Sequence, residues 1–216
     1  MGVCPKQNSE IAKLENVSSA REAKEANIED RQNIQRLDLV WSSWCNLDTN
    51  TIDDDNDDHD VLKGLQPHPN LKGLQIAHFK GTKFPLWMII EIDSFLPNLV
   101  ETYLIGCRRL ENVPMFGYLP LLRDLFIEGL EFKCIQFYGV VNNSNSRNAV
   151  AGRGGDHGPT TVTLFPLLKH LWPIDMPNLV EWKEASSSCS SNSIFPCLEQ
   201  FTTENCPKLN QAMPYC

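Results

Sequence analysis

Aspartates between residues 48 and 60 are the first candidates for chemistry in this chain, because they are spaced like calcium ligands. Asp53, Asp55 and Asp57 would occupy the first, third and fifth positions of an EF-hand loop. The rest of that loop does not fit, since Asp58 stands where the sharp turn needs Gly and Gly64 stands where the bidentate Glu belongs. We therefore predict a self-repelling, solvated acidic loop and no metal site.

Glycines between residues 152 and 158 are the next candidates, for a phosphate-binding loop. They miss the GxGxxG spacing, no apolar strand immediately precedes them, and the chain contains no GxxxxGKS or GxxxxGKT phrase. The sequence therefore predicts a surface insertion here and no cofactor.

Nucleophiles and bases also lack a catalytic arrangement. The five histidines form no HExxH or HxH pair, and no GxSxG elbow is present. The eight cysteines include no CxxC pair, which argues against a zinc site and a disulfide framework. Cys107 and Cys206 are instead expected to be buried free thiols, and we expect no enzyme activity.

An apolar phrase that recurs along the chain is more informative than any of these residues. Residues 99–107 read LVETYLIGC, close to the LxxLxLxxC strand of a leucine-rich repeat. Partial copies are IQRLDL, LKGLQI, LRDLFI, LKHLWPI and LEQFTTENC. A segment repeated in this way cannot bury its apolar face alone, so it has to stack on its neighbours. The sequence predicts an α/β leucine-rich-repeat solenoid of about six or seven irregular repeats. Short parallel strands should line its concave face, with irregular or helical segments on the convex side.

Insertions lengthen several of the repeats. Residues 48–60, 142–163 and 186–193 are polar or acidic and are predicted to be loops within one repeat domain at 11–214. Residues 1–10 are predicted to be a disordered N-terminus.

Local signals place some connecting elements. Ser18 or Ser19 should cap a helix from Ala20 to about Arg31. Pro173 occupies an apolar strand position and removes an amide donor that an interior strand should supply.

Charge and hydropathy exclude several classes of partner. The formal net charge is −8, and seven acidic residues lie between 48 and 60, so the acidity is mostly that of one loop and gives no sign of nucleic-acid binding. No run of eighteen apolar residues occurs, and the first residues lack the apolar stretch of a secretory signal. We expect no membrane partner and a cytoplasmic location.

A candidate binding surface follows from the strand register. The residue between two inward apolar positions points outward, and stacked repeats bring these residues into a column. Three neighbouring members are aromatic, as in the centre of many protein interfaces. An alternative left open is that another domain of the same protein covers the rings. The predicted protein-binding residues are Asp38, Gln75, Tyr103, Phe126 and Trp172 in the column, with Arg36, Glu101, Asp124, Glu128 and His170 beside it.

Three stretches resemble a known family: KLENVSSAREAKEANIEDRQNIQRLDLVWS, VLKGLQPHPNLKGLQIAHFKGTKFPLWM and LPNLVETYLIGCRRLENVPMFGYLPLLRDLFIEGL. They look like the leucine-rich-repeat region of plant nucleotide-binding leucine-rich-repeat disease-resistance proteins of the coiled-coil class, here truncated. The resemblance covers residues 11–139 and, more weakly, 164–214.

The resemblance implies a protein-interaction module that recognises a pathogen effector or a guarded host protein and restrains the receptor's own nucleotide-binding domain. No residue of the phosphate-binding loop is present, so no nucleotide binding is implied. Two alternatives stay open: a receptor fragment or pseudogene product without independent activity, and a different leucine-rich-repeat scaffold or adaptor. An extracellular repeat protein is disfavoured because the chain has no LxGxIP phrase.

Overall fold

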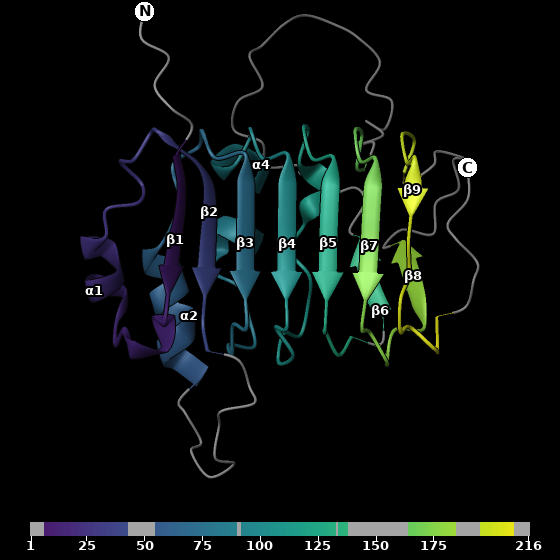
Figure 1. Cartoon of the computed structure of the whole chain (residues 1–216), viewed down its shortest axis with the longest axis horizontal. Helices are drawn as coiled ribbons and strands as arrows, with labels where there is room; N and C mark the ends of the chain where they lie inside the picture. Colours follow the sequence, from purple (N-terminus) through teal and green to yellow (C-terminus); the bar gives the residue numbers. More distant parts are fainter. Residues whose placement is uncertain are drawn as a thin grey trace, which may run out of the picture.

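The large sheet of this protein is a row of parallel strands that follow one another in chain order (Figure 1). The computed structural model describes residues 7–42, 55–89, 92–132, 134–137, 164–184 and 195–209. Within them the order is β1-β2-β3-β4-β5-β7-β9, and every pairing is parallel. This confirms the predicted solenoid. The strands are β1 (Gln7–Ala12), β2 (Ile34–Val40), β3 (Gly73–Ala77), β4 (Glu101–Ile105), β5 (Asp124–Glu128), β7 (His170–Ile174) and β9 (Gln200–Phe201).

Short and irregular elements connect these strands, as expected for the convex side. In Figure 1, α2 and the small parallel sheet of β6 and β8 lie behind the large sheet, and α1 lies beside β1. The elements are η1 (Leu14–Asn16), α1 (Ala20–Glu25), α2 (Asp55–Gly64), α3 (Leu86–Ile89), α4 (Ile92–Phe95), η3 (Phe116–Tyr118), β6 (Cys134–Phe137) and β8 (Glu181–Glu184).

The inner side chains of the strands form two buried rows that are apolar except for Thr102, which lies between Leu74 and Leu125. Leu37, Leu74, Leu125 and Leu171 lie in register in the first row, and each is at most 1% exposed. The second row holds Leu39, Ile76, Leu104 and Ile127, all fully buried. Burying one such side chain contributes about 1.5–3 kcal/mol, so the rows are a major source of stability.

Proline sets the turn before several strands. In these turns Pro is the second residue, and the amide of the fourth residue, a leucine, donates to the carbonyl of the first, as in a hydrogen-bonded β-turn. The leucine is then buried in the core, except that Leu198 is only partly buried against it. The bonds are Leu71 to His68, Leu99 to Leu96, Leu168 to Phe165 and Leu198 to Phe195, with N···O distances of 3.0 to 3.4 Å.

A second recurring feature follows β3, β4, β5 and β7. The first residue after the strand has a positive φ and donates its amide to the last carbonyl of the next strand in the row or, after β7, to the carbonyl of Glu204 in the isolated bridge beyond β9. Gly106, with φ of 63°, is one of these residues, and a Cβ there would lie 2.5 Å from the Nδ1 atom of His78. The bonds are His78 to Ile105, Gly106 to Glu128, Gly129 to Ile174 and Asp175 to Glu204, at 2.7 to 3.0 Å.

Three expectations about the connections need correction. Residues 7–10 were expected to be disordered, but they belong to β1, which pairs with β2 through backbone hydrogen bonds. The helix capped by Ser19 stops at Glu25, well before Arg31, because Asn27 adopts a left-handed conformation with φ of 51°. Part of the predicted acidic loop is helical, since α2 begins at Asp55. Asp58 of that helix accepts a hydrogen bond from the Trp41 indole at 3.0 Å.

The predicted loops at 142–163 and 186–193, and residues 1–6, lie outside the described residues.

Pro173 is buried inside β7, and the amide that it lacks affects only one edge of that strand. Its carbonyl and that of Leu171 accept the amides of Glu204 and Thr202, so this edge of β7 faces β9. An ordinary residue at 173 would offer its own amide to the same side. The continuous pairing of β9 ends at Phe201 and resumes only as the isolated bridge between Ile174 and Glu204. The missing amide therefore interrupts the last strand and leaves the pairing with β5 intact.

Thr102 occupies an inner position where its neighbours are leucines, and we expect its replacement by Val to stabilise the fold. Its side chain is fully buried, and its hydroxyl has no hydrogen-bond partner among the described residues. Replacing an unpaired buried hydroxyl with a methyl group of similar volume should raise the free energy of unfolding by about 1 kcal/mol. Urea denaturation checks this; a loss of stability would mean that the hydroxyl is bonded.

Cys107, which follows β4, has a buried thiol and is 1% exposed. Its Sγ atom lies 3.6 Å from the carbonyl oxygen of Ile76. Burial raises the pKa of this thiol from 9.0 to about 12. Because the folded-state pKa is the higher one, the protonated thiol stabilises the fold fully below pH 9, and this contribution is lost between about pH 9 and 12. We expect iodoacetamide at pH 8 to modify the exposed Cys197 quickly and Cys107 only after unfolding, as read by peptide mass spectrometry.

Candidate protein-binding surface

The ten predicted surface residues all lie on one face of the large sheet, here called the open face. Asp38, Gln75, Tyr103, Phe126 and Trp172 are register partners in consecutive strands and form the central column. Arg36, Glu101, Asp124 and His170 form the row two residues earlier, with Gly73 between Arg36 and Glu101. Glu128 lies in the row two residues later. All ten side chains are half-buried.

Aromatic rings make up one half of this column. Tyr103 and Phe126 have ring centroids 5.8 Å apart with planes tilted by 36°. Trp172 follows Phe126 in register, and its ring stacks on the His170 imidazole at 5.3 Å. These side chains hold each other in place, because each contacts a neighbour on an adjacent strand or on its own strand. A preordered aromatic surface loses little side-chain entropy when a partner binds.

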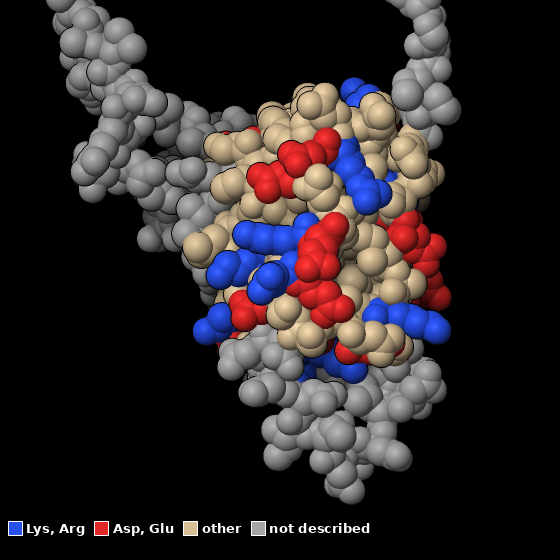
Figure 2. Space-filling view, turned by 90° about the vertical axis from the view of Figure 1, so that its left-hand side faces the viewer, with Lys and Arg blue, Asp and Glu red and all other residues tan. Residues whose placement is uncertain are grey.

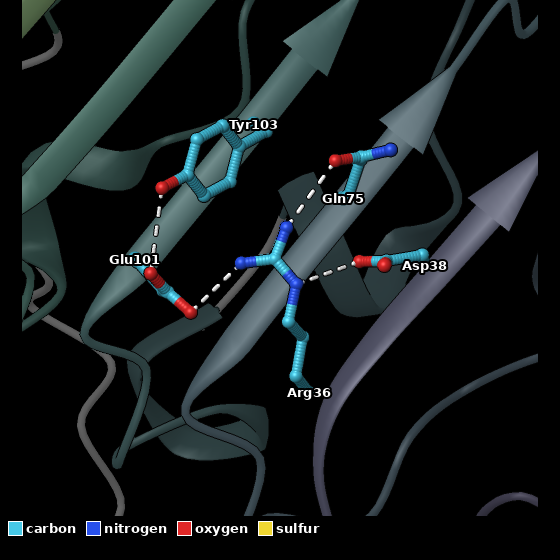
Figure 3. A network of polar contacts seen from close by, with 5 residues as sticks. All are labelled: Arg36, Asp38, Gln75, Glu101 and Tyr103. Carbon is cyan, nitrogen blue, oxygen red and sulfur yellow. Dashed lines mark hydrogen bonds and ion pairs between the residues drawn. The ribbon is translucent and has the colours of Figure 1, made fainter. Parts of the chain in front are cut away.

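Arg36 organises the polar half of the open face (Figure 3). Its guanidinium bonds Asp38 at 3.0 Å, Glu101 at 2.9 Å and Gln75 at 3.3 Å. It also lies over the Tyr103 ring, 4.8 Å from the centroid. The Tyr103 hydroxyl donates to Glu101 at 3.4 Å and closes the network.

Gly73 makes the long reach of Arg36 possible. It lies on β3 between Arg36 of β2 and Glu101 of β4. A Cβ at this position would lie 2.6 Å from the Glu101 carboxylate and 3.3 Å from the Arg36 stem. The missing side chain therefore leaves the space through which the ion pair crosses a whole strand.

The network alters two ionisation equilibria. Burial acts to lower the pKa of Arg36, but the carboxylates of Asp38 and Glu101 outweigh it and raise that pKa, so Arg36 stays charged. Burial, reinforced by the charge of Glu101, raises the pKa of Tyr103. The Tyr103 hydroxyl is therefore a neutral hydrogen-bond donor at physiological pH.

A groove of about 750 Å³ opens at the end of the open face, beside the left-handed turns that follow β4, β5 and β7. Ile105 and Glu128, the last outward residues of β4 and β5, form part of its wall. Its charged lining consists of Glu128, Glu131, Asp175 and Arg108. The repeat phrase did not reveal this groove, because it depends on turn conformations. The glycines at 106 and 129, which follow the strands directly, are the signal that could have indicated it.

The end of the solenoid formed by β1 and α1 differs from the open face. Figure 2 shows basic and acidic side chains interspersed there. Mixed charges of this kind give no strong field of one sign.

The residues that the structure describes contain no candidate metal site and no candidate membrane-spanning helix. There, no group of three or more His, Cys, Asp or Glu side chains is arranged to hold a metal ion. None of the helices placed by the structure is long and apolar enough to cross a membrane.

Comparison with known proteins places this geometry in a family. Residues 5–130 match the R13L1/DRL21 leucine-rich repeats. Two Arabidopsis thaliana proteins named for disease resistance, the second of them RPP13-like, are 30% and 27% identical over 213 and 207 residues, each match covering 94% of this chain. Disease resistance protein RGA2 of Solanum bulbocastanum is 35% identical over 115 residues, or 53% of the chain.

The matched region is a small part of each relative, 13%, 18% and 11% of their respective lengths. No solved structure matches the chain. The recurring phrase, the parallel sheet in chain order and the matched residues agree, and the chain belongs to the R13L1/DRL21 family of leucine-rich repeats.

Proposed function

We propose that this chain is a protein-binding repeat module of a plant disease-resistance receptor and that it binds its partner through the open face. The observation that carries the proposal is the aromatic half of the column, Tyr103, Phe126 and Trp172, held in register on three consecutive strands of the sheet. Aromatic anchors at the centre of a polar rim are typical of protein interfaces. The relatives named for disease resistance support the biological setting.

The proposed partner is a pathogen effector, a host protein that an effector modifies, or the nucleotide-binding domain of the same receptor. The relatives are several times longer than this chain, which makes a partner within the same receptor reasonable. The proposed action is contact without catalysis, and the proposed location is the cytoplasm.

Replacement of Tyr103, Phe126 and Trp172 by Ala should abolish partner capture while the fold persists. The rings are half-buried and face outward, so their loss removes binding area from the open face and leaves the inner rows intact. We expect at least about a tenfold drop in the captured partner, because central aromatic anchors each contribute about 2 kcal/mol or more. The measurement is quantitative mass spectrometry of proteins captured from pathogen-challenged leaf extract.

The matched control replaces three exposed apolar residues outside the open face, Leu86, Phe95 and Leu167, by Ala. It should retain the partners that the open-face variant loses. If the control loses the same proteins, or if the open-face variant no longer unfolds cooperatively on heating, the rings are not the binding surface.

A further inference from the structure

The open face has an excess of negative charge that the sequence total does not explain. Five carboxylates and one guanidinium occupy the outward positions of the strands of the large sheet. None of these residues belongs to the acidic segment at 48–60 that dominates the net charge of the chain. The carboxylates are Glu10, Asp38, Glu101, Asp124 and Glu128, and the guanidinium is that of Arg36.

Internal pairing leaves much of this charge uncompensated. Arg36 is already bound by Asp38 and Glu101. Asp124 contacts the Nδ1 atom of His170. The carboxylate of Glu128 has no hydrogen bond or ion pair with any described residue. The unpaired carboxylate of Glu128 therefore lies beside the aromatic rings and away from Arg36, whereas Glu10 lies on β1 next to Asp38.

The Arg36 contact shows which chemical group this surface accepts. A guanidinium lies 4.8 Å from the centroid of Tyr103 while bonded to carboxylates on β2 and β4. Phe126 and Trp172 are the next rings in the column, and Asp124 and Glu128 lie two residues before and after Phe126. Residues two apart on a strand share a face, about 7 Å apart. The combination of ring and carboxylate recurs there, and among the described residues no Lys or Arg forms an ion pair with Asp124 or Glu128.

The groove extends the same chemistry beyond the strand ends. Its lining has three carboxylates, Glu128, Glu131 and Asp175, against the single guanidinium of Arg108. Glu128 belongs both to the groove and to the open face, so the ring column and the groove form one continuous surface. A long flexible side chain with a cationic end matches this arrangement, because its stem can contact the rings while its charged end reaches the carboxylates.

We propose that the partner segment recognised by the open face is positively charged: its apolar side chains pack on Tyr103, Phe126 and Trp172, and a Lys or Arg side chain enters the groove beside Glu128. The proposal rests on the protein-binding function argued above and specifies the chemistry of the partner. An acidic segment would face like charges at Asp124 and Glu128, which disfavours its binding.

A pair of synthetic peptides tests whether the open face prefers a positively charged partner segment to a negatively charged one. The probe is a fluorescein-labelled peptide of three Arg-Gly-Leu-Gly repeats, and its counterpart has Glu in place of each Arg. Fluorescence anisotropy with the intact chain should show the Arg peptide binding at least about tenfold more tightly than the Glu peptide at low salt. Its binding should weaken when the salt concentration is raised to about 0.3 M, because screening acts on exposed pairs.

Charge variants locate the binding. Glu128→Lys should weaken the Arg peptide about five- to tenfold, because it exchanges an attraction for a repulsion. Glu29→Lys changes the net charge of the chain by the same amount at an exposed position outside the sheet. The affinity of this variant for the Arg peptide should stay within about twofold of the wild-type value. Glu128→Gln, which keeps the shape of the side chain, gives a second variant and should weaken binding about twofold or more.

Each alternative outcome contradicts a separate claim. Equal binding of the two peptides, no binding of either, or equal losses in Glu128→Lys and Glu29→Lys would overturn the preference for a cationic partner. Phe126→Ala should weaken the Arg peptide through loss of the leucine contact. If Phe126→Ala weakens both peptides equally while Glu128→Lys has no effect, the rings still bind protein and only the charge assignment is wrong. If Phe126→Ala leaves Arg-peptide binding unchanged, the open face itself is refuted.

Discussion

Leu104→Asp is expected to abolish the cooperative unfolding of the repeat array. Leu104 is fully buried in β4, between Ile76 of β3 and Ile127 of β5. An aspartate there would place a carboxylate among aliphatic side chains with no cation to pair with, and the array would lose the packing of a central repeat. We expect a loss of at least about 4 kcal/mol in the free energy of unfolding, measured by urea denaturation.

The matched control is Ile105→Asp, one residue further along the same strand. Ile105 points to the open face and is half-buried. The same substitution should cost no more than about 1 kcal/mol there, because the carboxylate reaches water. If Leu104→Asp unfolds with the same midpoint as Ile105→Asp, the inward and outward positions of β4 have been assigned the wrong way round.

Phe79→Ala should produce the second largest effect, a loss of about 3–5 kcal/mol. Phe79 is fully buried just after β3. Its ring stacks on Phe84 with centroids 5.7 Å apart and meets the edge of Trp41 at 5.2 Å. Truncation leaves a cavity that these two rings cannot fill without moving. For a chain of this size we expect the melting temperature to fall by about 10 °C, as read by circular dichroism.

Phe95→Ala is the control for that experiment. Phe95 is 36% exposed at the end of α4, so its removal creates no closed cavity. The melting temperature should change by less than about 3 °C. Equal shifts for Phe79→Ala and Phe95→Ala would mean that the cluster of Trp41, Phe79 and Phe84 does not hold neighbouring repeats together.

The strand register was predictable from the sequence because it depends on local spacing. Side chains alternate along a strand, so the apolar pair of each repeat phrase identifies the inward positions, and the residue between them must face outward. The sequence alone therefore predicts that Gln75, Tyr103 and Phe126 lie side by side, as the register shows. Even the copy interrupted by Pro173 keeps its register with β5.

Elements stabilised by neighbouring segments could not be predicted in this way. β1 has the sequence QNSEIA, with no repeat phrase, and it forms because the edge of β2 offers free backbone donors and acceptors. The pairing of β6 with β8 joins segments far apart in the chain, a long-range contact that local periodicity does not encode. α2 begins inside a run that the composition alone marked as an acidic loop.

Only part of the candidate site was predictable from the sequence. The outward column followed from the register, but the Arg36 network did not, because it depends on the absence of a side chain at Gly73 on the intervening strand. The groove depends on left-handed residues after the strands, and some of these are not glycine: His78, Asp175 and Asn205. A non-glycine residue at positive φ carries only a weak sequence signal.

Spin labels at Trp172, the last residue of the central column, and at Glu10, which pairs with Asp38 at the other end, test the stacked register most directly. Glu10 and Trp172 lie in register on β1 and β7, five strand pairings apart, so their Cα atoms should be about 24 Å apart. Labels introduced at these positions on unnatural amino acids, measured by double electron–electron resonance, should give a single distance near this value once label length is included. A Glu10–Phe126 pair should read about 5 Å shorter. A Glu10–Trp172 distance equal to or shorter than that of Glu10–Phe126 would contradict the solenoid and the open face built on it.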